Sequence, residues 1–181
     1  VLLAAVDGAG GGALNNIVRD IAASGSNLYV AGAFTDVNNG GTVIPEADYI
    51  AMWNGTDWSA LGSNGAGNGA LNNLALTVAV NNSDVYVGGY FKDVNNLSAA
   101  DSVAKWDTLA GKWSALGSNG AGNGSLSGIV TSLALSGSDV YVGGYFLNVN
   151  NNGAVLTAAD YVTKWDGSNW SALGNNGAGN G

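Results

Sequence analysis

One seven-residue segment occurs three times in this chain of 181 residues and divides it into repeating units. Val-Tyr-Val-Gly-Gly-Tyr-Phe spans Val85–Phe91 and again Val140–Phe146, and the variant Leu-Tyr-Val-Ala-Gly-Ala-Phe spans Leu28–Phe34. The three copies therefore start 57 and 55 residues apart. A period of about 40–50 residues or slightly more, with several short strands per period, is typical of propeller-type arrays. A unit of this kind cannot bury its apolar face alone, so each unit is expected to need neighbours.

Each copy is predicted to form four short antiparallel strands. The strands of the third copy are predicted at Ile129–Leu135, Val140–Phe146, Tyr161–Trp165 and Asn169–Leu173, because these runs are β-rich and bounded by turn residues. The matching strands are at 18–23, 28–34, 49–53 and 58–61 in the first copy, and at 76–80, 85–91, 103–106 and 112–116 in the second. The predicted fold class is all-β, with no helix of note. It is an array of three four-stranded antiparallel blades, completed by other blades or other copies.

The ends of the units are marked by the recurring sequence Asn-Gly-Ala-Gly-Asn-Gly. This divides the chain into blade 1 at 13–69, blade 2 at 70–124 and blade 3 at 125–181. Residues 1–12 match 58–69 in place, so they are predicted to be a spare outer strand with its Gly-rich linker.

Aromatic and glycine positions recur in register with the strands. The pair Gly143-Gly144 interrupts the second strand, where another backbone must come close or the strand must bend. The repeating tryptophans are Trp53, Trp58, Trp106, Trp113, Trp165 and Trp170. They could form a ring of sugar-stacking platforms or pack between blades. Their fixed period favours repeat packing, because a buried indole covers a large area.

These segments resemble kelch-like and galactose-oxidase-type β-propeller repeats, and most closely those of bacterial or fungal surface proteins. The resemblance is carried by Tyr141–Phe146, Thr163–Gly174 and Ala104–Asp107. It implies a propeller-type fold over nearly the whole chain, but not one function, because such folds host unrelated roles. Galactose oxidase uses copper held partly by His and a Cys-modified Tyr. This chain contains neither His nor Cys, so that activity is not expected.

The composition argues against several classes of function. The absence of His removes the usual general base and the commonest metal ligand, and the absence of Cys removes thiol chemistry. The net charge of −8 disfavours binding to nucleic acid. No apolar run approaches the length of about 18 residues that a membrane span needs, so no membrane insertion is expected. We predict a protein that is not an enzyme and has no catalytic residue, cofactor or metal.

Acidic and amide residues recur in two places of the unit. Asp36–Asn39, Asp93–Asn96 and Asn148–Asn151 could offer oxygen atoms to Ca²⁺, but their spacing fits no EF-hand. Asx residues also stabilise turns by bonding to their own backbone, which is the favoured interpretation. Asp48, Asp101 and Asp160, before the third strand, are likewise interpreted as turn or cap residues.

Five sequons provide candidate glycosylation sites if the chain passes through a glycosylating pathway. They are at Asn54, Asn81, Asn96, Asn123 and Asn169.

Three blades are too few to close a ring, since propellers use about 4–8. The spare strand Val1–Val6 (Val1, Leu2, Leu3, Ala4, Ala5 and Val6) is therefore a candidate self-association strand. Three interpretations remain open, besides that of a frayed terminus with no such role. The chain is cut from a longer array, two chains complete a six-bladed ring, or the strand adds to the sheet edge of a neighbouring subunit and builds a filament.

The function predicted from these features is that of an extracellular or cell-surface structural repeat protein. It would assemble with other copies of itself as a filament, sheath or adhesin segment, through blade-to-blade packing and strand addition. The alternative is a β-propeller binding module that recognises glycan or protein.

Overall fold

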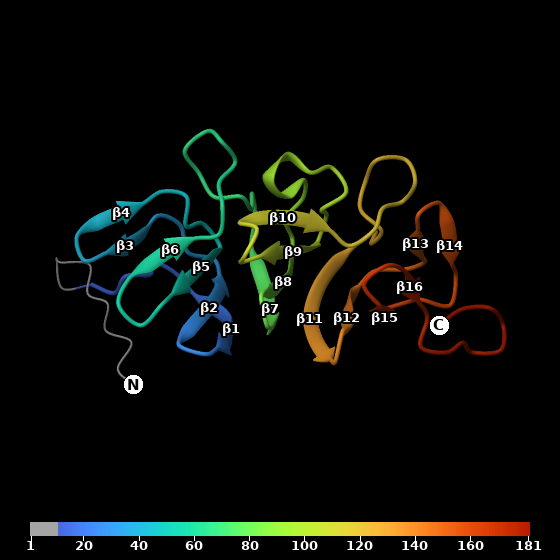
Figure 1. Ribbon diagram of the computed structural model, residues 1–181. Coiled ribbons are helices and arrows are strands. Elements are labelled where there is room, and N and C mark those ends of the chain that lie inside the picture. The colour runs from blue at the N-terminus through green and yellow to red at the C-terminus, as the bar shows by residue number, and fades with distance from the viewer. Residues whose placement is uncertain (1–10) are drawn as a thin grey trace.

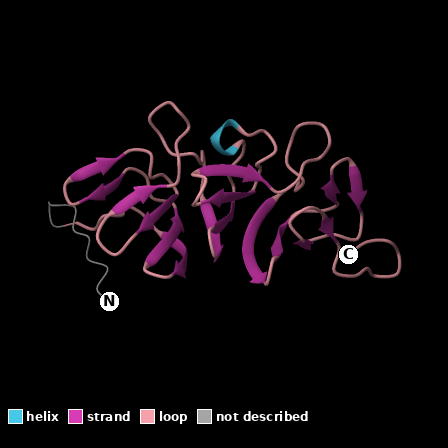
Figure 2. Cartoon of the chain, in the orientation of Figure 1, coloured by secondary structure: helices cyan, strands magenta, loops and turns pink. Residues whose placement is uncertain are grey.

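A computed structural model describes residues 11–181 of the chain, which form three four-stranded antiparallel sheets (Figures 1 and 2). Sheet 1 contains β1 (Val18–Ser24), β2 (Asn27–Gly32), β5 (Ile50–Trp53) and β6 (Trp58–Ala60). Sheet 2 contains β7 (Ala75–Asn81), β8 (Asp84–Gly89), β9 (Val103–Asp107) and β10 (Lys112–Ala115). Sheet 3 contains β11 (Ile129–Ser136), β12 (Asp139–Tyr145), β15 (Val162–Trp165) and β16 (Trp170–Ser171).

The all-β class is confirmed, and each of the twelve predicted strands is found with ends that differ by at most two residues. The three sheets stand in a row, with sheet 2 between sheets 1 and 3 (Figure 1). Their first strands, β1, β7 and β11, lie side by side along the row. The arrangement is open, because sheets 1 and 3 lie at opposite ends.

Each first strand carries a bulge near its start. The pairing shifts between Val18 and Asp20 in β1, and at the matching places in β7 and β11. The second glycine of each Gly-Gly position lies opposite this bulge. A Cβ atom on Gly89 or Gly144 would overlap a backbone carbonyl oxygen, of Leu74 or Ile129 respectively. The expectation that another backbone comes close here is therefore confirmed.

Two of the three units carry a short hairpin after the second strand, where the sequence analysis predicts turn residues and no strand. Two short hairpins occur there, one of β3 (Val37–Asn39) and β4 (Thr42–Ile44), the other of β13 (Val149–Asn151) and β14 (Ala154–Leu156). In each hairpin an Asn side chain closes the turn, because its Oδ1 accepts a glycine N–H at 2.7 Å. The middle unit is four residues shorter at this point and forms only the 3₁₀ turn η1 (Val94–Asn96). Among residues 11–181, η1 is the single helical element, and no helix there could span a membrane.

The aspartates before the third strand have the turn role expected of them. Oδ1 of Asp48 accepts the backbone N–H of Asp36 at 3.0 Å, and its Oδ2 accepts that of Gly69 at 3.1 Å. Asp101 makes the same two kinds of bond, and Asp160 makes the first. Each carboxylate thus fixes the loop that leaves the second strand.

The buried apolar residues fall into three clusters. One lies between sheets 1 and 2, and another between sheets 2 and 3. The third lies on the side of sheet 1 that faces away from sheet 2, and includes Val30, Phe34 and Trp58. Packing between sheets is therefore the main source of the core.

Candidate self-association faces

The chain has two internal joints, one between sheets 1 and 2 and one between sheets 2 and 3. An equivalent hydrogen bond is found at each of them. Trp113 Nε1 donates to the carbonyl oxygen of Leu61 at 2.6 Å, and Trp170 Nε1 donates to that of Leu116 at 2.7 Å. Both indoles are buried, as are the two leucine side chains, which are 2% and 3% exposed. A buried N–H needs such an acceptor, so this bond fixes the register of each joint.

All six tryptophans lie in pairs across the third and fourth strands of the sheets. The ring centroids are 5.5 Å apart in Trp53–Trp58, 5.5 Å in Trp106–Trp113 and 5.3 Å in Trp165–Trp170. The fourth-strand member of each pair is buried. These rings therefore lie within the packing of the sheets.

The side chains that face each other across the two joints differ in size. At the second joint, a Cβ atom on Gly88 would overlap Cγ1 of Val130. The strand registers place Ala31 and Ala75 at the corresponding positions of the first joint, and both are fully buried in its apolar cluster. One joint therefore uses two alanines where the other uses glycine and valine.

The side of sheet 1 that faces away from sheet 2 is called here the leading face, and comprises Val18, Ile21, Val30 and Trp58. Val18 is 37% and Ile21 is 50% exposed, whereas Ala75 and Val130, which match Val18, are fully buried. Trp58 matches Trp113 and Trp170 and is only 4% exposed, but among the described residues its Nε1 has no hydrogen-bond acceptor. A buried donor without an acceptor costs about 1–3 kcal/mol.

A cavity of about 230 Å³ opens on the leading face. Besides Gly12, it is lined by Ala13, Leu14, Val18, Ile21, Val30 and Trp58. The matching residues of sheet 2 are Ala70, Leu71, Ala75, Val78, Val87 and Trp113, and they belong to one apolar cluster with Leu61 of the preceding sheet. The cavity therefore corresponds to the place where a leucine packs at the first joint.

The side of sheet 3 that faces away from sheet 2 is called here the trailing face, and comprises Tyr141, Gly143, Val162 and Leu173. Val162 is 45% exposed, while the matching Ile50 and Val103 are 2% and 3% exposed. Leu173 is 50% exposed, although the matching Leu61 and Leu116 are buried. A cavity of about 290 Å³ lies beside Val162 and Leu173. The trailing face thus carries apolar side chains at the positions that are covered in the other two sheets.

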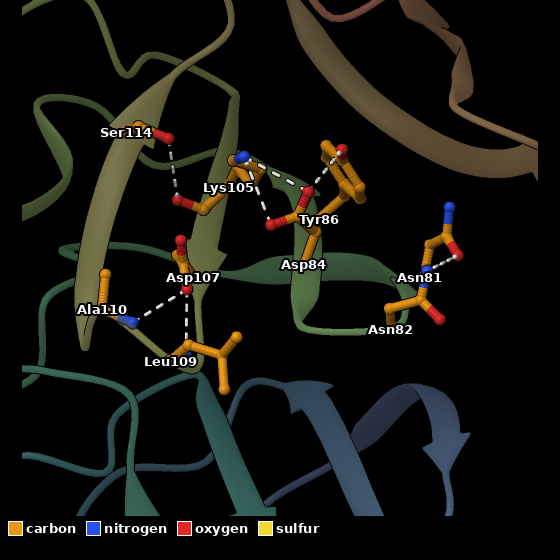
Figure 3. A network of polar contacts seen from close by, with 9 residues as sticks. All are labelled: Asn81, Asn82, Asp84, Tyr86, Lys105, Asp107, Leu109, Ala110 and Ser114. Carbon is orange, nitrogen blue, oxygen red and sulfur yellow. Dashed lines mark hydrogen bonds and ion pairs between the residues drawn. The ribbon is translucent and has the colours of Figure 1, made fainter.

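Polar and charged groups gather in a cleft between sheets 2 and 3, and Figure 3 shows four of them: Lys105, Asp84, Tyr86 and Ser114. Lys105 Nζ lies 3.2 Å from Asp84 Oδ1, and the Tyr86 hydroxyl donates to Asp84 Oδ2 at 3.4 Å. Burial, followed by the charge of Asp84 and this hydrogen bond, raises the pKa of Tyr86 to about 12. These residues help to line a cavity of about 320 Å³.

Sheet 3 repeats the ion pair of this cleft. Lys164 Nζ lies 3.0 Å from Asp139 Oδ2, and this contact raises the pKa of Lys164. Sheet 1 has Asn27 and Met52 at the two positions, so it has no such pair.

The remaining predicted site residues are not gathered in one place. Val1–Val6 lie outside the described residues. Of the sequon residues, Asn54, Asn96, Asn123 and Asn169 are exposed. Asn81 is half-buried, and its amide donates to the carbonyl oxygen of Gly137 across the second joint at 2.7 Å.

The sequence analysis missed the residues that set the fit of the joints. These are the carbonyl oxygens of Leu61 and Leu116, and the small residues Ala31 and Gly88. The sequence did contain a signal for these small residues. The second strands of the three units are similar, but the same position is alanine in the first unit (Ala31) and glycine in the other two (Gly88 and Gly143). The role of this position could be assigned only from the strand register, which shows which residue of the next sheet it faces.

Comparison with known proteins identifies no family. No protein-family model matches the chain, and no curated protein matches it. Among solved structures, it is similar to the computationally designed protein Ika4, with 16% identity and a TM-score of 0.43 over 88% of this chain and 93% of that one. It is also similar to the computationally designed Ika8, with 15% identity and a TM-score of 0.41 over 86% of this chain. The chain spans 46% of the length of Ika8.

Proposed function

We propose that this protein is a structural repeat subunit that assembles with copies of itself through packing between sheets. The observation that carries the proposal is the exposure of the two end faces. Leu173 and Val162 of the trailing face are about half exposed, and so is Ile21 of the leading face. The residues that match Leu173 and Val162 at the internal joints are covered, and so is Val78, which matches Ile21 at the first joint. Contiguous apolar surface of this kind is typical of protein interaction sites.

The two end faces differ, so contact between copies would be head-to-tail. A head-to-tail contact produces a ring if its rotation closes and an open filament if it does not. A filament, sheath or adhesin segment at the cell surface is the outcome we favour, with kelch-like, propeller-type blades as its units. Low charge density and a chain without Cys or His suit such a passive structural role.

The spare strand Val1–Val6 has a part in this proposal. Its residues are apolar and match the fourth-strand position of a unit, so we propose that another copy covers it. Deletion of Val1–Val6 should then weaken assembly. If the chain without Val1–Val6 assembles as well as the full chain, the strand has no part in assembly. The proposal that copies assemble through packing between sheets would still stand.

The first test is electron microscopy of the native protein together with its mass in solution. Long regular fibres support a structural polymer. Closed rings of two chains would instead indicate a six-bladed propeller and would direct attention to a ligand on its central face. A mass that stays at 18.0 kDa at every accessible concentration would contradict self-assembly.

A second candidate function is a binding module for glycan or protein. The observation in its favour is the cavity of about 320 Å³ between sheets 2 and 3, which offers the Lys105 ammonium, the Asp84 carboxylate and the Ser114 hydroxyl. Hydroxyl-rich ligands suit such a mixed set of donors and acceptors. A glycan array tests it, since a purely structural subunit should bind no glycan specifically.

A further inference from the structure

We infer that the trailing face of one copy seats on the leading face of the next in the register of the internal joints. This inference rests on the proposed function and specifies its interface. Leu173 of one copy fills the cavity on sheet 1 of its neighbour, and its carbonyl oxygen accepts the N–H of Trp58. Gly143 faces Val18 across the same contact. A second copy of this chain is therefore the occupant of the leading face.

The first argument is the buried indole. At both internal joints the fourth-strand tryptophan donates to the leucine carbonyl of the preceding sheet, at 2.6 and 2.7 Å. Trp58 is the third member of this set, and its N–H has no acceptor among the described residues. Leu173 is the third member of the leucine set, and its side chain is 50% exposed. The Trp58 donor and the exposed Leu173 side chain thus stand at opposite ends of the row of sheets.

The second argument is the match of side-chain sizes. Gly88 faces Val130 at the second joint, where a Cβ atom would overlap the valine. Gly143 holds the position of Gly88 on the trailing face, and Val18 holds the position of Val130 on the leading face. The three nearest heavy atoms to a Cβ atom on Gly143 all belong to the third unit: Ser132 Oγ at 2.5 Å, Ser132 Cβ at 3.9 Å and Tyr161 O at 3.9 Å. The end faces therefore repeat the glycine–valine pair of the second joint.

The third argument concerns which segment occupies the leading face, the chain's own first residues or a second copy. Residues 1–12 match 58–69 in sequence, which places Ala4 at the position of Leu61. Leu173 retains the leucine that packs at both internal joints, and a complete four-stranded sheet presents it. The trailing face of another copy therefore supplies the leucine side chain and carbonyl oxygen that both internal joints use.

A size-swap experiment on the full chain tests this register, with sedimentation velocity as the measure of self-association. Gly143→Ala adds a methyl group that must overlap Val18 of the neighbour, and should weaken association at least about tenfold. Val18→Ala added to Gly143→Ala recreates the Ala31–Ala75 pair of the first joint. This double variant should recover association to within about threefold of the wild type.

Two further variants keep the test decisive. Ser132→Ala, combined with Gly143→Ala, removes the contact of the added methyl group with Ser132 Oγ inside sheet 3. This double variant should still associate at least about tenfold more weakly than the wild type. Trp58→Phe removes the indole N–H and should weaken association about fivefold, the effect of about one hydrogen bond. Urea unfolding of each variant confirms that the monomer remains folded.

The outcomes separate this inference from the proposed function. If the wild type does not self-associate, the proposed function and the interface both fail. If the wild type assembles but Gly143→Ala associates as tightly as the wild type, the register is wrong while self-assembly stands. A double variant that stays as weak as Gly143→Ala would also overturn the register.

Discussion

The carboxylate of Asp20 in sheet 1 accepts a hydrogen bond from the hydroxyl of Thr77 in sheet 2 at 2.9 Å. The same oxygen, Oδ2, accepts the backbone N–H of Val78 at 2.9 Å. Asp20 and Thr77 hold the same position in the bulge of their own strands, so the bulge of one sheet is bonded directly to that of the next. Ser132 holds this position in sheet 3 and is exposed.

Replacing Asp20 by Ala should destabilise the chain by about 1–3 kcal/mol, because it leaves the Thr77 hydroxyl and the Val78 N–H without their acceptor. The measurement is the free energy of unfolding from urea titrations. Ser132→Ala is the matched control and should change stability by less than about 0.5 kcal/mol. Equal effects of the two changes would show that the bond contributes nothing to the first joint.

Two matched tryptophan variants should differ in stability. Trp113→Phe leaves the buried carbonyl oxygen of Leu61 without its donor, whereas Trp58→Phe removes an N–H that has no acceptor among residues 11–181. Both changes remove the same atoms from a buried indole. Trp113→Phe should therefore cost about 1–3 kcal/mol more than Trp58→Phe in the free energy of unfolding of the monomer. A larger cost for Trp58→Phe would contradict the assignment.

Gly88→Ala should be among the most damaging single substitutions in sheet 2. The added methyl group must overlap Val130 across the second joint, and overpacking of this kind costs about 1–3 kcal/mol or more. Adding Val130→Ala should restore part of the loss, because it approaches the Ala31–Ala75 pair of the first joint. Thermal unfolding of the single and double variants measures the recovery. A loss in the double variant that equals the sum of both single effects would contradict direct contact between the positions.

Stability should fall at high pH as Tyr86 ionises. Burial raises its pKa from 10.0 to about 12, so the folded chain holds the phenolic proton more tightly than the unfolded chain. The stabilisation from this difference is complete below pH 10 and is lost as the pH rises from 10 to about 12. Ultraviolet absorbance of tyrosinate should show one late-titrating group, which Tyr86→Phe removes. Identical absorbance titrations of the two proteins would contradict the shift.

Self-association should strengthen with ionic strength. Each copy carries a net charge of −8, so approaching copies repel one another. The Debye length falls from about 30 Å at 0.01 M salt to about 8 Å at 0.15 M, which screens this repulsion. Sedimentation at the two salt concentrations should show an association constant several-fold higher at 0.15 M. Weaker association in salt would indicate ion pairs across the interface instead.

The repeating pattern of residues was sufficient to predict the strands but not their contacts. Alternating apolar residues and turn signals such as Asp166-Gly167 act locally, so they located all twelve strands of the three sheets. The β3–β4 hairpin was missed because Asn38 and Asn39 suggest a loop. Their extended backbone depends on pairing with Thr42 and Val43. The role of Gly88 also depends on Val130, a residue that the sequence alone does not place beside it.

The alternation of small side chains at the joints has a consequence for folding fidelity. Adjacent repeats of similar sequence are prone to exchange partners while they fold. If sheet 1 docked directly on sheet 3, Ala31 would take the place of Gly88 opposite Val130. A Cβ atom at that place would overlap Val130. The three near-copies therefore do not fit one another equally. These differences in side-chain size disfavour a misfolded arrangement in which sheet 1 packs directly on sheet 3.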